Sequence, residues 1–495
     1  MTSLAPLLRK EARAVIPLWG ATVTALALAY LWRGRAFLDI GLFAYVVGAM
    51  AIGAQAIGQE YSCRTLSMLL VQPTGRARIY VVKLSVAAVF LALLAALAWF
   101  VFRDAWRPGS GHVRAVILPV LGALFLAPFF TMIGRGVLVG MILSGSAPAM
   151  LWLLVLVVSW FGFGIDPDHA SEVLLGRSGV WMMAVACPLL GYLGWRRFAT
   201  LEAGDADAAA FRLPRWLDGD AAARRPARLA ALVMKETHLH QLTFAVTGVC
   251  VVIYLVAVLL QRVSASVAAF PVGPVLLMYC LGVALVVGAM ASAEERQLGM
   301  HDGQRLQPAP AWQQWTVKVG MAFGLAILLG VALPMLLVRL AVNGGVGLTR
   351  LWFDLATVIV LLTAGGLYVS SLAASGVRAL AWTLPAGIAA AMFVQTSDAA
   401  LRWVTLQVWG RAMADVVSGA VVPTSVGPEQ RMMFAIRVFV VTLVPVLVWF
   451  GFVNHHGSEP NPRRTIGQLA AIALVIATGM FVAGALVAAA AVWVT

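Results

Sequence analysis

The sequence predicts an all-α polytopic membrane protein, built as two tandem parallel six-helix transmembrane repeats followed by one extra C-terminal span. Three observations predict this fold class: the apolar composition, apolar segments of spanning length along the whole chain, and charged residues that recur at matching positions in both halves. Hydrophobic residues make up 62% of the chain and charged residues 11%, with a mean hydropathy of +0.92. Soluble domains carry roughly a quarter charged residues, so lipid must be the main solvent of this chain.

The predicted spans follow from segment length, because a helix needs about 20 apolar residues to cross the hydrocarbon core. Six such segments lie in the N-terminal half and seven in the C-terminal half: 15–33, 38–58, 79–102, 115–134, 147–164, 178–196, and then 241–261, 270–292, 315–338, 351–374, 379–396, 434–453, 466–493. We therefore expect a first half over 1–198, a cytoplasmic linker over 199–228, a second half over 229–454 and an additional helix within 455–495.

The net charge of +14 is spread over the loops and is not gathered on one soluble domain, which argues against a nucleic-acid partner. The positive-inside rule explains it better. With a cytoplasmic N-terminus, all four lysines (Lys10, Lys83, Lys235 and Lys318) and the arginine-rich linker fall inside. We expect a multi-pass protein of a cell membrane, in bacteria the inner or plasma membrane, with Thr495 outside.

An internal duplication is indicated by the order and spacing of these charged residues. Lys10-Glu11 precedes the first span and Lys235-Glu236 precedes the seventh. Pro73 lies 13 residues after Glu60 and 10 before Lys83, and the same spacings separate Glu295, Pro308 and Lys318. A shared order and spacing at the same topological station predict a tandem repeat. Six spans per copy make the repeat parallel.

The loops that follow the second and eighth spans are predicted to be cytoplasmic. Each begins at an acidic residue, Glu60 or Glu295, and re-enters the membrane after a proline and a lysine. Pro73 and Pro308 should end any short helix before them, and Lys83 and Lys318 should snorkel to the boundary. Because we expect Glu60 and Arg64 at that boundary, loss of either charge should cost little stability, under about 1 kcal/mol. The segments 3–14 and 229–240 are amphipathic and are expected to lie along the interface, although each could simply be a cytoplasmic extension of the span that follows it.

The loop GQEYSCRTLSMLLVQPTGRARIYVVK (58–83) resembles the signature of the ABC type-2 permease family, in which an acidic residue, an Arg-Thr-Leu step, a proline and a basic re-entry follow one another. The resemblance is weaker at 293–318, where Leu298-Gly299-Met300-His301 replaces the Thr-Leu step. By this resemblance the chain is a fused full-size permease of an exporter of hydrophobic or amphipathic substrates. Two copies of a cytoplasmic ABC ATPase, which would hold ATP and Mg, are the implied partners beside membrane lipid.

The same resemblance implies roles for individual residues. The ATPase-coupling loops would contain Glu60, Arg64, Pro73, Arg76, Arg78, Lys83, Glu295, Arg296, Pro308 and Lys318. The segments before spans 1 and 7 would be elbow helices that contain Arg9, Lys10, Glu11, Lys235 and Glu236.

Other functions find less support in the residues. The chain contains no GxxxxGK[ST] motif and so cannot hold ATP phosphates by that loop, and we expect no catalytic residue and no cofactor of its own. The pairs His238/His240 and His455/His456 lack clustered carboxylates or cysteines, so no metal site is predicted. An ion-gradient-driven secondary transporter is the alternative, disfavoured because Asp and Glu lie mostly at span ends. A lipid-modifying membrane enzyme is disfavoured further. Arg135, within an apolar stretch, either lines a pathway or ends a span.

Overall fold

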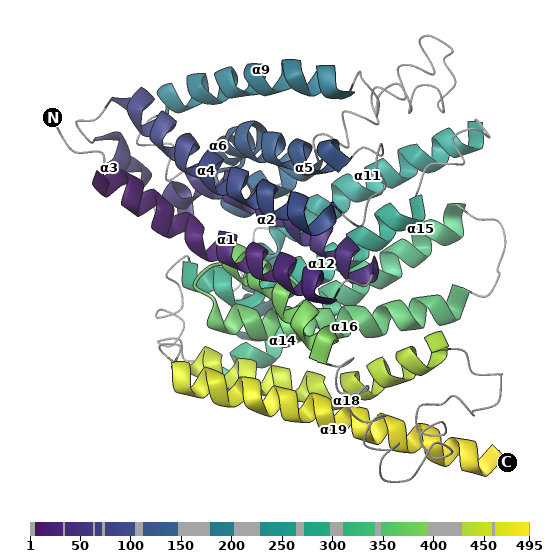
Figure 1. Cartoon of the computed structure of the whole chain (residues 1–495). Helices are drawn as coiled ribbons and strands as arrows, with labels where there is room; N and C mark the ends of the chain where they lie inside the picture. The colour runs from purple at the N-terminus through teal and green to yellow at the C-terminus, as the bar shows by residue number, and fades with distance from the viewer. Residues whose placement is uncertain are drawn as a thin grey trace.

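The computed structural model describes residues 5–32, 35–62, 65–71, 75–103, 112–146, 179–201, 228–263, 272–297, 310–341, 348–393, 428–457 and 461–494. Within these ranges the regular structure is entirely helical, which confirms the predicted class (Figure 1). The predicted span 147–164 lies outside the described residues, as does nearly all of the linker.

The first half consists mainly of long helices. In chain order they are α1 (Ala5–Trp32), α2 (Arg35–Ser62), the short α3 (Leu66–Leu70), α4 (Arg76–Phe102), the continuous set α5 (His112–Leu121), η1 (Gly122–Leu126) and α6 (Ala127–Gly134), a short helix Val137–Ser146, and α9 (Gly179–Ala199). Arg135 has the left-handed φ of 50° at the end of α6. It therefore lies at a break between two helices and not inside a continuous span.

The second half repeats this style of organisation. Its helices are α10 (Arg228–Leu239), α11 (Gln241–Val263), α12 (Val272–Gln297), the continuous set α14 (Ala311–Ile327), η6 (Leu328–Ala332) and α15 (Leu333–Ala341), α16 (Leu348–Leu372), a helix Gly376–Phe393, α18 (Pro428–His456) and α19 (Pro462–Val494). Figure 1 shows the start of α1, α3 and the start of α19 at one end of the bundle, and the chain terminus after α19 at the other. We call the first of these the α3 end.

Nine helices in the described ranges are long and apolar enough to cross a membrane, and a tenth follows if the bent pair α10 and α11 forms one span. The chain is therefore a multi-pass membrane protein by helix length and hydropathy. The predicted spans 178–196 and 270–292 correspond to α9 and α12, which are helical over 21 and 26 residues but fall outside this set.

The two predicted elbow helices differ from each other. The second is a distinct helix, because α10 meets α11 at a bend of 55° around His240. The first is not, because α1 runs from Ala5 to Trp32 without interruption. The prediction of a separate helix at 3–14 is thus wrong for the described residues, and this segment is the beginning of the first span. Glu11 and Ala14 of this segment are buried.

In the described residues two π-helical turns interrupt the spans, and each is followed by a proline two positions after its last residue. Pro128 follows η1 and Pro334 follows η6. A proline lacks the N–H that would bond to the carbonyl four residues earlier, and its ring crowds that carbonyl. Those carbonyls belong to Leu124 and Gly330, in the middle of the two turns, so local widening of the helix is the expected response.

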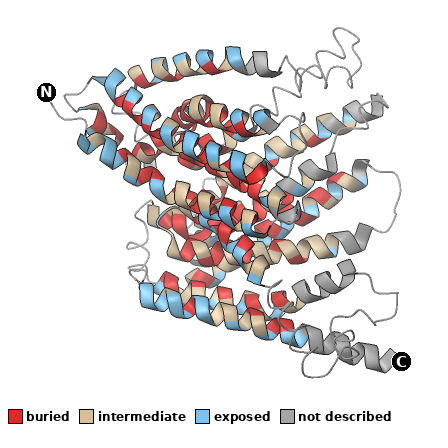
Figure 2. Cartoon of the chain, viewed as in Figure 1, coloured by how far each residue is buried: buried red, intermediate tan, exposed pale blue. Residues whose placement is uncertain are grey.

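The largest core cluster joins the two halves. It contains residues of α1, α2 and α4 together with residues of α12 and the helix Gly376–Phe393, among them Tyr45, Ala49, Leu91, Leu285 and Leu380. Figure 2 shows the buried residues gathered in the middle of the bundle and the exposed ones on its outer helices. The halves therefore share one core.

Small residues allow the closest helix contacts. A Cβ added at Gly288 of α12 would lie 2.7 Å from the carbonyl oxygen of Thr363 and 3.0 Å from the Cα of Gly366, both on α16. In the first half, a Cβ at Gly53 of α2 would overlap the backbone of Ala123 in η1. These contacts agree with the packing of membrane helices through small residues.

The extra helix α19 is attached to the second half by buried amides. Asn454 of α18 and Gln468 of α19 form a reciprocal pair, each side-chain amide nitrogen donating to the other's oxygen at 3.0 Å. Tyr368 of α16 donates to the same Gln468 oxygen at 3.2 Å. In a membrane such polar contacts between helices replace the hydrophobic effect as a source of specificity.

Candidate functional site

A buried cluster of opposite charges lies at the α3 end of the first half. The Lys83 ammonium on α4 contacts the carboxylate of Glu11 on α1 at 2.7 Å and that of Glu60 on α2 at 2.9 Å. These three side chains are between 0% and 4% exposed. Lys10, which is half-exposed, reaches the same Glu60 oxygen at 2.9 Å. The cluster therefore ties α1, α2 and α4 together, and we call it cluster 1.

The short helix α3 begins beside cluster 1. The hydroxyl of Thr65 donates to the second oxygen of Glu60, and its backbone N–H donates to the Glu60 carbonyl. Leu66 and Leu69 of α3 are fully buried among residues of α2, α4, α6 and α9, including Ile57, Tyr80, Met132 and Phe198. Glu60 and this apolar cluster thus fix α3 at the end of the bundle.

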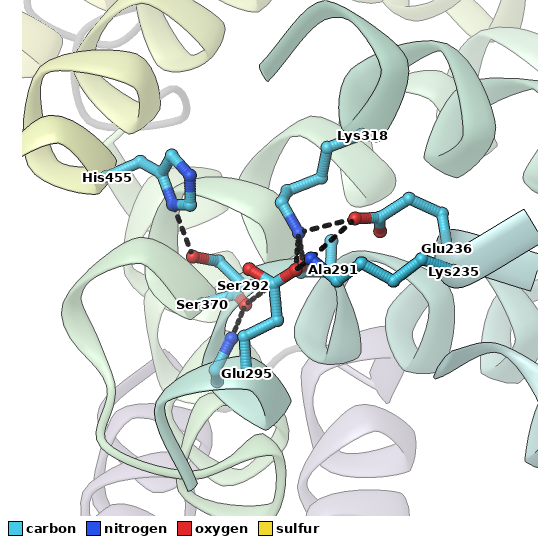
Figure 3. Close-up of polar contacts among 9 residues, drawn as sticks. Lys235, Glu236, Ala291, Ser292, Glu295, Lys318, Ser370 and His455 are labelled. Atoms are coloured by element: carbon cyan, nitrogen blue, oxygen red, sulfur yellow. Dashed lines mark hydrogen bonds and ion pairs between the residues drawn. The ribbon is translucent and has the colours of Figure 1, made fainter. Parts of the chain in front are cut away.

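The second half contains a cluster of the same composition (Figure 3). Lys318 of α14 contacts Glu236 of α10 at 3.1 Å and Glu295 of α12 at 2.8 Å. Lys235 lies 2.5 Å from Glu295. Lys318 also donates to the backbone carbonyl of Ala291 at 2.6 Å. We call this cluster 2; its lysine and both carboxylates are as buried as those of cluster 1.

The two clusters use the residues that the sequence spacing had paired. Each contains a Lys-Glu step in the helix that begins its half (α1 or α10), a glutamate near the end of a later long helix (α2 or α12), and a lysine in the long helix that follows the next loop (α4 or α14). In each, the buried lysine bridges the two glutamates and the more exposed lysine contacts the second glutamate. This agreement supports the proposed duplication.

Two expectations about these residues are wrong. Lys83 and Lys318 do not snorkel, since their side chains are 0% and 1% exposed. Glu60 is not an exposed boundary residue whose removal would cost little stability, because its side chain is 1% exposed and contacts two lysines. Breaking a buried ion pair by removing one partner leaves a charge without compensation, which costs far more than an exposed pair is worth. The spacing of residues in the sequence does not distinguish an exposed charge at the membrane boundary from a buried ion pair.

The remaining predicted residues lie in different environments. Arg76 donates to the carbonyl of Ala199 at the end of α9, and Arg296 donates to that of Asn454 at 3.2 Å. Arg78 and Arg9 are exposed. Three other predicted positions, Arg64, Pro73 and Pro308, lie outside the described residues. The predicted short helix before Pro73 is confirmed as α3.

A polar contact network beside cluster 2 was not predicted. The Ser370 hydroxyl of α16 accepts hydrogen bonds from the backbone N–H groups of Ser292 and Ala293 at 2.9 and 2.8 Å. The Ser292 hydroxyl lies 3.3 Å from Nδ1 of His455 (Figure 3). The His455 ring also packs against that of Trp315. His455 follows the predicted span 434–453 and is buried near the end of α18. The Ser370-Ser371 pair within an apolar span was the available signal.

Both clusters hold helices together through buried ion pairs. In both clusters the carboxylates are occupied by lysines, and in the described residues no group of three His, Cys, Asp or Glu side chains could hold a metal ion. A buried multi-helix ion-pair cluster fixes the relative position of its helices. Cluster 1 therefore joins α1, α2 and α4, and cluster 2 joins α10, α12 and α14.

Comparisons of this chain with protein-family models, with curated proteins and with solved structures found no match. The class of this protein is therefore described from its own structure: it is a helical multi-pass membrane protein with a buried lysine-glutamate cluster in each half.

Proposed function

We propose that this chain is the permease subunit of an ATP-driven exporter of the ABC type-2 class, and that separate cytoplasmic ATPase subunits act on its α3 end. The proposal includes a parallel duplication, a cytoplasmic α3 end and an inner or plasma membrane location. The cargo would be hydrophobic or amphipathic.

The observation that carries the proposal is the construction of α3. One side of this short helix is buried through Leu66 and Leu69, whereas Met68 and Val71 are 73% and 79% exposed. Apolar side chains so exposed at the end of the bundle are typical of a surface that a partner covers. The partner we infer is the ATPase, because α3 occupies the coupling-loop position of the motif at 58–83.

Cluster 1 gives this surface a connection to the membrane. Glu60 binds Thr65 at the start of α3 and contacts Lys83 and Lys10. A displacement of α3 by a partner is therefore passed to α1, α2 and α4 together. Cluster 2 would do the same for the loop that follows α12. This arrangement also supports the exporter over an ion-driven transporter, because the buried carboxylates of both clusters already contact lysines.

The test is recovery of the complex with single α3 variants. The tagged chain is purified from its native membrane, and the stoichiometry and Mg-dependent ATP hydrolysis of the eluate are measured. Wild type should bring two copies of an ATPase per chain. Met68→Glu should lose them, because it places a charge on the docking surface. Thr200→Glu adds the same charge to an exposed position after α9 and should retain them. Recovery of wild type without any ATP-hydrolysing subunit would refute the proposal.

A further inference from the structure

A cleft of about 570 Å³ opens at the α3 end, where the first half meets the second. Most of its wall is the first part of α1, including Arg9, Lys10 and Arg13. Gln59 of α2 completes the first-half side, and Arg378, near the start of the helix Gly376–Phe393, comes from the second half. The cleft therefore exists only when both halves are in place.

The charge in this cleft is not balanced by the residues that line it. Four of the lining side chains are cationic and none is acidic. Lys10 is engaged by Glu60 at 2.9 Å. Among the described parts of the chain, Arg9, Arg13 and Arg378 have no carboxylate within ion-pair distance. Three guanidinium groups thus face one cleft without an ion-pair partner among the described residues.

The backbone adds to this positive potential. Ala5 and Pro6, in the first turn of α1, also line the cleft, and of these two Ala5 has a backbone N–H whereas Pro6 has none. The first turn of a helix has N–H groups without intrahelical partners and carries the positive end of the helix dipole. The same site therefore combines planar guanidinium donors with a helix N-terminus, two features that favour a phosphate group.

Apolar exposure along the same helix indicates where that phosphate comes from. Leu8 and Ile16 of α1 are 40% and 49% exposed, on either side of the arginines in sequence. A soluble phosphate would gain nothing from these side chains, whereas the acyl chains of a phospholipid would cover them. Basic pockets between spanning helices are also typical sites for anionic headgroups.

We propose that this cleft binds a phosphate group, held by Arg9, Arg13 and Arg378, and that its source is the headgroup of an anionic membrane phospholipid. Because Arg378 belongs to the second half and the other two to the first, the bound lipid bridges the halves. This inference does not depend on the proposed transport function.

The test uses the chain alone in nanodiscs of phosphatidylcholine with or without phosphatidylglycerol. Thermal unfolding and native mass spectrometry measure lipid retention for wild type, Arg378→Gln and the double variant Arg9→Gln/Arg13→Gln. The control Arg463→Gln removes an exposed arginine at the start of α19, at the same end of the bundle. Each guanidinium near a lipid surface contributes about fivefold in affinity. Arg378→Gln should therefore bind phosphatidylglycerol about fivefold more weakly than wild type, and Arg463→Gln should bind it normally.

The remaining outcomes are equally decisive. Equal losses in Arg378→Gln and Arg463→Gln would show general surface charge and overturn the site. If inorganic phosphate added to phosphatidylcholine discs stabilises wild type as much as phosphatidylglycerol does, and only when Arg378 is present, the cleft takes a soluble anion and the lipid assignment is wrong. Should Arg378→Gln fail to fold, Arg378→Lys keeps the charge, and wild-type retention by it would overturn the requirement for a guanidinium group.

Discussion

Lys83 and Glu11, on α4 and α1, lie 2.7 Å apart with side chains 0% and 4% exposed. Lys318 and Glu236, on α14 and α10, have the same relationship at 3.1 Å. In both halves this contact fastens the helix that begins the half, α1 or α10, to the long helix that follows the predicted coupling loop, α4 or α14. The centre of each cluster is therefore buried, and its more exposed member is Lys10 in cluster 1 and Lys235 in cluster 2.

Removing Lys83 should destabilise the protein strongly. Lys83→Ala leaves Glu11 buried without a cation, which should cost about 3–5 kcal/mol. Lys10→Ala removes a 44% exposed partner of Glu60 and should cost under about 1 kcal/mol. Thermal unfolding in a mild detergent measures both. Similar losses from the two variants would contradict the central role of Lys83.

Replacing the whole of cluster 1 should be tolerated better than breaking it. The triple variant Glu11→Gln, Glu60→Gln, Lys83→Met removes all three buried charges together, and such replacements are often close to neutral. We expect it to regain most of the stability that Lys83→Ala loses. It should nevertheless transmit motion from α3 poorly, so that ATP hydrolysis in the reconstituted complex is uncoupled from transport. Full coupling in the triple variant would show that cluster 1 is not the connection.

The hydroxyl of Ser370 should contribute measurably to the contact between α16 and α12. Ser370→Ala removes the acceptor for the N–H groups of Ser292 and Ala293, which should cost about 1 kcal/mol. Ser85→Ala is the control, because that hydroxyl bonds only to the carbonyl of Val82 on its own helix. Thermal unfolding of the two variants would contradict this assignment if Ser85→Ala were the more damaging.

Two glycines of α12 should respond oppositely to alanine. At Gly288 the new methyl group would meet the backbone of α16 at 2.7 Å, and backbone atoms cannot move aside. At Gly282 there is nothing within 4 Å, and alanine favours a helix over glycine by up to about 1 kcal/mol. Gly288→Ala should therefore lower the unfolding temperature, and Gly282→Ala should preserve or raise it. A stable Gly288→Ala would mean that α12 and α16 are farther apart than described.

Orientation can be decided by cysteine labelling in a background without native cysteines. Thr200→Cys lies at the α3 end and should react only from the cytoplasmic side. Val113→Cys, on α5, is 52% exposed and belongs to the opposite end, so it should react only from outside. Labels that appear on the same side would refute the predicted topology.

The sequence predicted the helical class and paired the residues of the two clusters, because both depend on patterns along the chain. Hydropathy places spans, and the recurrence of Glu60, Pro73 and Lys83 at 295, 308 and 318 identifies matching stations. The burial of Lys83 and Lys318 could not be predicted in the same way, since a lysine near a span end can either snorkel to the surface or turn inward. It turns inward here because Glu11 and Glu236 lie within reach, and the positions of these glutamates depend on packing between helices that are distant in sequence.

The contacts made by small polar residues were even less accessible to sequence reasoning. Ser370 and Gln468 carry no periodic signal, and a hydroxyl or amide in a span can bond within its own helix or across to another. The continuity of α1 was left open by its amphipathic pattern, because an interfacial helix and a buried extension of a span show the same spacing. The buried Glu-Lys contact does not decide between them, because Glu11 makes it in the continuous α1 and Glu236 makes it in α10, which is bent away from α11.

The uninterrupted α1 and the bent pair α10 and α11 should make the two halves respond differently to a force applied at their loops. α1 is a continuous helix of 28 residues whose weakest point is Pro17, because a proline cannot donate to the carbonyl four residues earlier, that of Arg13. A tilt applied beside Arg9 is therefore passed toward Trp32 through a helix that can flex at Pro17 but has no open joint. The 55° bend at His240 provides such a joint in the second half, where α10 can move with α12 and α14, to which cluster 2 ties it, while α11 stays in place. Under the proposed function, equal displacements of the two loops should therefore move the far end of the bundle more on the α1 side.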